Sequence, residues 1–188
     1  MGSGRQVAVF GAYGHTGRFV VAELLERGYV PVLSGRDADK LKAMGHEAGL
    51  DARVASADDP ASLDRALAGT SAVINCAGPF ASTTAPVIEA ARDVVSPHTP
   101  APTAADESGR SDQTFVIDAV VRSGDTERRA VARGQDIYAI TAPLVVEALD
   151  RVLGGHIHAV GVASAGRMFF ADDFLRALSP QIALELHQ

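Results

Sequence analysis

Three evenly spaced glycines begin the part of the sequence best suited to bind a ligand. Gly11, Gly14 and Gly17 follow the apolar run Val7-Ala8-Val9-Phe10 and precede a stretch with helical periodicity. In such a turn the first glycine permits a tight bend, the second lets a phosphate approach the backbone, and the third lets the helix pack against the strand. The helix also directs free N–H groups and the positive end of its dipole outward. The pattern therefore predicts an anion site that fits a diphosphate.

Three side chains inside this turn belong to the same predicted site: Tyr13, His15 and Thr16. His15 either contacts a phosphate or faces solvent. The glycine spacing is GxxGxxG rather than GxGxxG, so a structural strand–helix corner without a ligand remains the alternative.

The end of the next apolar run carries a cation. Residues 30–34 read as a second short strand, which ends at Ser34-Gly35-Arg36. In a dinucleotide fold this position faces the adenosine ribose, where an acidic residue holds the 2′-hydroxyl and an arginine accepts a 2′-phosphate. Arg36 therefore favours NADP over NAD. Asp37 follows directly, so NAD remains an alternative cofactor. The other interpretation of Arg36 is an exposed charge in a loop.

A third segment completes the predicted cofactor site. Residues 72–75 read as a strand that runs into small residues, against which a ribose or nicotinamide could lie. The cofactor-binding prediction here covers Asn75, Cys76, Ala77, Gly78 and Pro79. An ordinary strand–helix turn is the alternative, with Cys76 as a small apolar core residue, because no base can be assigned to activate its thiol.

The sequence shows no catalytic constellation. A short-chain dehydrogenase would show a tyrosine followed four residues later by lysine, but Tyr13, Tyr29 and Tyr138 are followed there by glycine, leucine and alanine. The six histidines have no metal-ligand spacing, so we expect no metal site. Asp136 and Tyr138 are interpreted as a structural turn and a packed ring. The catalytic residues stay unassigned.

Composition limits the class of partner. The chain has 188 residues, a formal charge of −6 and a pI near 5.4, which argues against nucleic acid or an anionic membrane as the main partner. A single cysteine excludes an internal disulfide framework. No run of 18 apolar residues and no signal-peptide pattern is present, so we expect a cytoplasmic protein.

The strands and helices alternate up to about residue 93. The pattern predicts an α/β fold, a Rossmann-like doubly wound parallel sheet, with a C-terminal β-hairpin and helices. Its domains would be a dinucleotide-binding domain over 1–93, a proline-rich linker or mobile loop over 94–113, and a hairpin with helices over 114–188. Further helices are expected near 39–48, from Asp59-Pro60 to about residue 69, and over 84–92.

The predicted hairpin has one apolar face that needs a cover. Phe115, Ile117, Ala119 and Val121 alternate on that face, and a two-stranded hairpin alone is marginal in water. A helix that begins with Thr141 as its cap would carry an apolar stripe made of Leu144, Val145, Ala148, Leu149 and Val152. These parts would pack on the first domain or on a second copy of the chain. We therefore expect a homodimer built through the hairpin.

Several of these segments together resemble one family. The stretches 11–18, 34–41 and 75–80 look like the NADP-binding domain of the saccharopine dehydrogenase-like reductases, which include trans-acting enoyl reductases, and 132–142 and 161–166 resemble their C-terminal part. The resemblance implies an NADP-dependent reductase that transfers hydride to an enoyl or imine substrate. Family members carry a middle α/β domain that forms the substrate pocket. The chain lacks this domain. Either the domain was lost in a natural or engineered deletion, or the protein is a minimal nucleotide-binding relic. A catalytically silent NAD(P)-binding module or subunit is therefore the alternative function.

Overall fold

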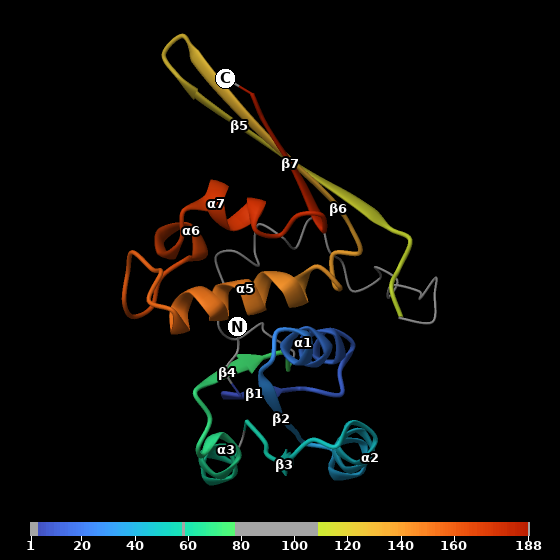
Figure 1. Ribbon diagram of the computed structural model, residues 1–188. Coiled ribbons are helices and arrows are strands. Elements are labelled where there is room, and N and C mark those ends of the chain that lie inside the picture. The colour runs from blue at the N-terminus through green and yellow to red at the C-terminus, as the bar shows by residue number, and fades with distance from the viewer. Residues whose placement is uncertain (1–3, 58, 78–108, 188) are drawn as a thin grey trace. The chain divides into compact units, whose positions relative to one another are not determined.

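The computed structural model describes residues 4–57, 59–77 and 109–187, and the chain divides into two compact units, Met1–Thr103 and Ala104–Gln188 (Figure 1). The expected helix over 84–92, most of the expected linker, and the site candidates Gly78 and Pro79 lie outside the described residues.

The N-terminal unit contains a parallel sheet flanked by helices, which confirms the predicted α/β class. Its strands are β1 (Gln6–Phe10), β2 (Val30–Gly35), β3 (Ala52–Val54) and β4 (Ala72–Asn75). Its helices are α1 (His15–Glu26), α2 (Ala38–Ala48) and α3 (Pro60–Leu67). Strand and helix alternate along the chain, which is the pattern of a Rossmann-like fold.

The order of the strands explains where this sheet can bind a ligand. The order is β3-β2-β1-β4, so the chain moves outward from β1 to β3 and then crosses back to the other side of β1. The carboxyl ends of β1 and β4 are therefore neighbours at the point where the direction of winding reverses. In open α/β sheets, ligands bind in the crevice at this point.

The core of the N-terminal unit follows from its apolar strands. Val7, Val9, Val32 and Leu33 are fully buried, as expected for parallel strands covered on both faces. Helix α1 buries Val20, Val21 and Leu24. Helix α2 buries Leu41 and Gly45, and Met44 is half-buried.

The C-terminal unit is built on an antiparallel sheet of order β5-β6-β7. Its strands are β5 (Thr114–Ser123), β6 (Thr126–Gln135) and β7 (Ile182–His187), and its helices are α5 (Thr141–Leu153), α6 (Ala165–Met168) and α7 (Ala171–Arg176). The expected hairpin is β5–β6. The third strand, β7, was not predicted.

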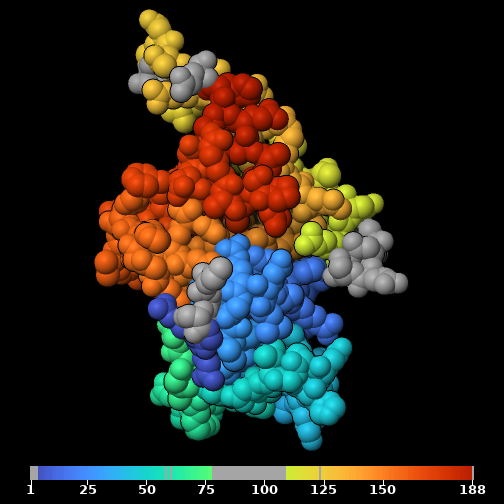
Figure 2. Space-filling view, viewed as in Figure 1, coloured from blue at the N-terminus to red at the C-terminus, as the bar shows by residue number. Residues whose placement is uncertain are grey.

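Only the first part of the hairpin is covered by the helices of its own unit. The core of the unit consists of Ile140, Phe169, Phe174, Leu178 and Ile182, and Phe115 packs against it. Ile117 and Val121 lie on the same face as Phe115 but are 56% and 66% exposed. The distal half of the hairpin stands clear of α5, α6 and α7 (Figure 2).

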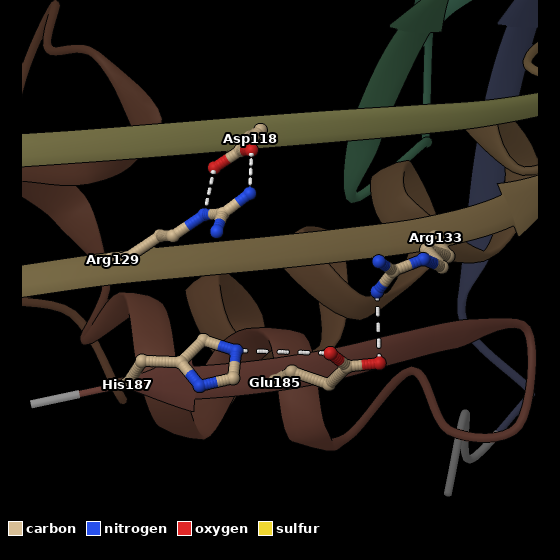
Figure 3. Close-up of polar contacts among 5 residues, drawn as sticks. All are labelled: Asp118, Arg129, Arg133, Glu185 and His187. Atoms are coloured by element: carbon tan, nitrogen blue, oxygen red, sulfur yellow. Dashed lines mark hydrogen bonds and ion pairs between the residues drawn. The ribbon is translucent and has the colours of Figure 1, made fainter.

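The opposite face of this sheet carries a ladder of ion pairs (Figure 3). Arg129 donates two hydrogen bonds to Asp118, and Arg133 contacts Glu185 at 2.8 Å. His187 lies 3.7 Å from the other oxygen of Glu185. The hydrogen bond from Arg129 lowers the pKa of the Asp118 carboxyl. Because these charges satisfy one another at the surface, we interpret the ladder as structural.

The expected cap of α5 was wrong, and its expected apolar stripe is confirmed in part. Thr141 is the first helical residue and not the cap, because Ile140 occupies the cap position and the Thr141 hydroxyl donates to the Ile137 carbonyl. Of the stripe, Leu149 is buried and Leu144 and Ala148 pack against the core, whereas Val152 is exposed. Ala142, Pro143 and Val146 are buried as well, so the buried face of the helix is wider than the stripe.

The turn before α5 depends on a buried carboxylate. Asp136 is 2% exposed, has a positive φ of 54°, and accepts hydrogen bonds from the backbone N–H groups of Ser111, Tyr138 and Ala139. These contacts agree with a structural turn. The ring of Tyr138 was expected to be packed, but it is 39% exposed, so that part of the interpretation was wrong. No helix in the described parts of the chain is long and apolar enough to span a bilayer.

Candidate functional site

The turn after β1 can only be made with glycine at its first position. Gly11 has a φ of +89°, and its N–H donates to the Ser34 carbonyl at 2.7 Å. A Cβ atom at Gly11 would lie 2.7 Å from the Ala77 nitrogen. The loop after β1 therefore touches the loop after β4 backbone to backbone, and a side chain between them would force the loops apart.

The third glycine brings α1 onto the same turn. A Cβ atom at Gly17 would lie 2.2 Å from the Gly11 carbonyl oxygen, so no side chain fits there. Gly14 is the residue before the helix, and its N–H donates to Gly11 at 3.0 Å. A glycine cannot cap a helix with a side chain, and α1 has no side-chain cap.

The start of α1 therefore presents donors without helical acceptors. The N–H groups of Thr16 and Gly17 lie in the first turn, where no preceding carbonyl of the helix can reach them. Such donors, together with the helix dipole, attract an anion. His15 is exposed, and its ring packs edge-on against Phe19 at 5.1 Å between centroids. The predicted role of this turn in binding an anion is consistent with a helix start that has no side-chain cap.

Tyr13 links the glycine turn to the end of β2. Its ring lies over Gly35, where a Cβ atom would be 2.6 Å from the ring, and its hydroxyl accepts a hydrogen bond from the Asp37 N–H at 3.2 Å. The Lys40 ammonium lies 5.7 Å from the ring centroid. The structure thus gives Tyr13 a role in holding the turn after β2, and its contact with a cofactor stays a prediction.

The end of β2 presents one buried hydroxyl and one exposed cation. The Ser34 side chain is fully buried, and its hydroxyl has no hydrogen-bond partner among the described residues. Arg36 is exposed, and no hydrogen bond or ion pair joins its guanidinium to any residue that the structure describes. Asp37, the neighbouring acid, instead caps α2 through the Lys40 N–H and pairs with the Lys40 ammonium. Arg36 is therefore available to an anionic ligand.

The end of β4 is held by a side-chain hydrogen bond within its loop and by a backbone hydrogen bond to β1. Asn75 accepts a hydrogen bond from the Ala77 N–H at 3.0 Å, and the Cys76 N–H donates to the Phe10 carbonyl at 2.8 Å. Burial raises the pKa of the Cys76 thiol to about 11. The thiol is therefore protonated at neutral pH, as expected for a residue that packs rather than reacts.

The predicted residues that the structure describes gather at one edge of the sheet, because the carboxyl ends of parallel strands share that edge. Next to them is a cavity of about 380 Å³ that the sequence reasoning missed, lined by Arg36, Val54, Ala55, Ser56, Asp59, Ser62 and Arg65. It lies between the ends of β2 and β3 and the start of α3. No motif marks it, since its residues come from separate segments.

A second cavity of about 710 Å³ lies within the C-terminal unit. Among the described residues that line it, Arg110, Arg133, Gln135 and Gln181 supply polar groups, and none is a carboxylate, histidine, cysteine or tyrosine. These lining residues therefore offer no acid–base pair. Among the described residues, no cluster of three metal-ligating side chains is present either.

The comparisons with known proteins concern the N-terminal unit. Residues 11–98 match the family described as NAD(P)H-binding. No curated protein is significantly similar to the chain.

Among solved structures, a nucleoside-diphosphate-sugar epimerase from Pseudomonas aeruginosa is 31% identical over 38% of this chain and 23% of its own, with a TM-score of 0.35. A short-chain dehydrogenase/reductase superfamily protein from Agrobacterium tumefaciens, with bound NAD, is 30% identical over 48% and 24% of the two chains, with a TM-score of 0.32. A Bacillus halodurans protein described as an NAD-dependent epimerase/dehydratase is 18% identical over 79% and 89%, with a TM-score of 0.48.

The match to the Pseudomonas and Agrobacterium proteins spans about a quarter of their length. The family match begins at Gly11 and includes the glycine turn, Arg36 and the loop after β4. The chain therefore contains an NAD(P)-binding domain of Rossmann-like fold.

Proposed function

We propose that the protein is an NADP(H)-dependent oxidoreductase that acts as a reductase. The observation that carries this proposal is the glycine turn, in which an uncapped helix start faces the reversal point of an NAD(P)-binding sheet. The diphosphate would lie at the N–H groups of Thr16 and Gly17, near Gly14. The loop from Asn75 to Ala77 would lie against the ribose or nicotinamide.

The preference for NADP(H) rests on the end of β2. A 2′-phosphate needs a cation, and Arg36 is exposed without a partner among the described residues. A ribose 2′-hydroxyl needs a carboxylate at this position, but the Asp37 carboxylate caps α2 and pairs with Lys40. Charge at this site therefore favours the cofactor that carries the additional phosphate.

The reductase proposal also draws on the resemblance to saccharopine dehydrogenase-like and trans-acting enoyl reductases. A bound nicotinamide supplies the hydride, and the protein's part is to position the cofactor and the acceptor. We propose an unsaturated or imine-type carbon as the acceptor. The described residues of the loop after β4 include no general acid, so the proton that the reduced acceptor takes up would come from solvent.

A catalytically silent NAD(P)-binding module is the second candidate function. Two observations favour it. The described residues around the cofactor site include no acid–base pair, and the Cys76 thiol stays protonated. Such a protein would bind the nucleotide as a sensor or as a subunit of a larger enzyme.

We also propose that two copies of the chain associate through β5. This strand lies at the edge of its sheet, and Val116, Ile117, Val120 and Val121 on it are exposed. Antiparallel pairing of two β5 strands about a two-fold axis at Val120 would place Asp118 of one copy opposite Arg122 of the other. The edge is thus apolar and complementary in charge to a second copy of itself.

Titration with NADPH and NADH on the wild type and on Arg36→Ala tests the proposed function. We expect the wild type to bind NADPH more tightly, and the variant to lose about 1 to 3 kcal/mol of binding to NADPH alone, the usual scale for a charged hydrogen bond. Equal affinity for the two cofactors in the wild type would refute the assignment of Arg36. NADPH oxidation with a panel of enoyl and imine substrates then separates the reductase from the silent module.

A further inference from the structure

We infer that Arg65, on α3, is a second residue that selects the 2′-phosphate of the cofactor. Arg65 and Arg36 line the same cavity of about 380 Å³, although Arg36 follows β2 and Arg65 lies on α3. This inference rests on the proposed binding of NADP(H) and concerns which residues distinguish NADP(H) from NAD(H).

The interactions of the arginines in the N-terminal unit single out this pair. Arg18 donates to the Tyr13 carbonyl, Arg27 pairs with Glu23, Arg53 pairs with Asp51, and Arg5 is also engaged. Arg36 and Arg65 are the two described arginines of this unit whose guanidinium groups contact no described side chain or carbonyl. Both face one cavity.

The position of Arg65 along α3 explains why it has no partner within its helix. The residues three and four positions away are Ala61, Ser62, Ala68 and Gly69, none of which is acidic. An arginine on a helix surface normally gains from a carboxylate at that spacing. The guanidinium of Arg65 is thus left to the cavity and to solvent.

The charge of the cavity suits a dianion. Among the described residues that line it, Asp59 is the one carboxylate, and its oxygen accepts the Ser62 N–H at the start of α3. The described lining therefore brings two guanidinium groups together with one carboxylate, which is already used as a helix cap. A phosphate monoester carries close to two negative charges at neutral pH and accepts hydrogen bonds from more than one guanidinium.

Helix α3 is held firmly enough to place the guanidinium. At its start, the Ser62 hydroxyl donates to the Asp59 carbonyl at 2.7 Å and accepts from the Ser56 N–H at 3.0 Å. At its end, Arg53 of β3 donates to the carbonyls of Ala66 and Ala68 at 3.1 and 2.7 Å. Because α3 is bonded to the loop after β3 at its start and to β3 at its end, the backbone at Arg65 is held beside the cavity.

The experiment compares the affinities of four variants for NADPH, NADH, 2′,5′-ADP and 5′-AMP by calorimetry. The variants are Arg36→Ala, Arg65→Ala, Arg65→Lys and Lys42→Ala, the last being a control that removes a cation from the exposed face of α2, outside the cavity. We expect Arg65→Ala to weaken NADPH and 2′,5′-ADP by about fivefold to tenfold and to leave NADH and 5′-AMP unchanged. Arg65→Lys should recover part of the loss, because lysine keeps the charge but not the planar fork.

Each outcome separates the two proposals. If Arg36→Ala loses NADPH selectivity while Arg65→Ala behaves like Lys42→Ala, the role of Arg65 is overturned and the proposed function stands. An equal loss of NADPH and NADH in Arg65→Ala would also overturn it, because the effect would not depend on the 2′-phosphate. If the wild type binds NADPH and NADH alike, the proposed NADP preference itself fails. Thermal unfolding of each variant shows whether α3 stays folded.

Discussion

At the scale of single residues, the predicted site contains glycines at which no side chain fits and a cysteine whose thiol is protonated. The sequence identified Gly11 and Gly17 from their spacing, and the close contacts at both positions give the physical reason for that spacing. That Arg36 has no partner among the described residues could not be predicted, because it depends on Asp37 turning to cap α2 and pair with Lys40. Spacing predicts backbone constraints well, whereas side-chain pairing depends on neighbours in space.

Cys76 provides a prediction at this scale. Because burial raises the pKa of its thiol to about 11, only a small fraction is thiolate at pH 8. We expect iodoacetamide to label native Cys76 slowly at pH 8, and to label it much faster once the protein is unfolded in urea. The native rate should rise steeply as the pH approaches the thiol pKa. Native labelling as fast as in urea would contradict the burial of the thiol.

At the scale of elements, the sequence predicted those with strong local signals and missed those without them. The pair Asp59-Pro60 predicted the start of α3, and the structure places Asp59 as its cap. Strand β7 was missed, although Ile182, Leu184 and Leu186 alternate with other residues. The segment is short and ends the sequence, and its pairing with β6 is a long-range contact that local pattern does not reveal.

The cap of α3 can be tested directly. Asp59→Ala removes the acceptor for the Ser62 N–H, so we expect a loss of about 1 kcal/mol in the free energy of unfolding of the N-terminal unit. Asp64→Ala is the matched control, because Asp64 is an exposed acid on the same helix with no cap role. Urea unfolding measures both variants. Equal stability of the two would show that the cap contributes nothing.

At the scale of the whole molecule, the chain combines an NAD(P)-binding unit with a C-terminal unit whose hairpin is only partly covered. The sequence predicted the apolar face of the hairpin and its need for a cover. It could not predict that the cover would end near Phe115, because the extent of packing depends on where α5 and α7 settle against the sheet. The exposed remainder is the physical basis of the proposed association.

Val120→Lys tests that association, because it places two charges at the centre of the proposed β5 pairing. We expect the wild type to be a dimer and the variant to be a monomer in light scattering at micromolar concentration. Val160→Lys is the control, since Val160 is 94% exposed in the loop between α5 and α6. A monomeric wild type, or a Val120→Lys protein that remains dimeric, would argue against pairing through β5.

Both candidate functions require the glycine turn to bind the paired phosphates of a dinucleotide. An NMR titration of ¹⁵N-labelled protein with NADPH observes the backbone amides of this turn one by one. We expect the largest shifts on the amides of Gly14, Thr16 and Gly17, with further shifts at Cys76 and Ala77. Saturating NADPH that leaves these amides unchanged, or that shifts only residues of the C-terminal unit, would contradict binding at this turn.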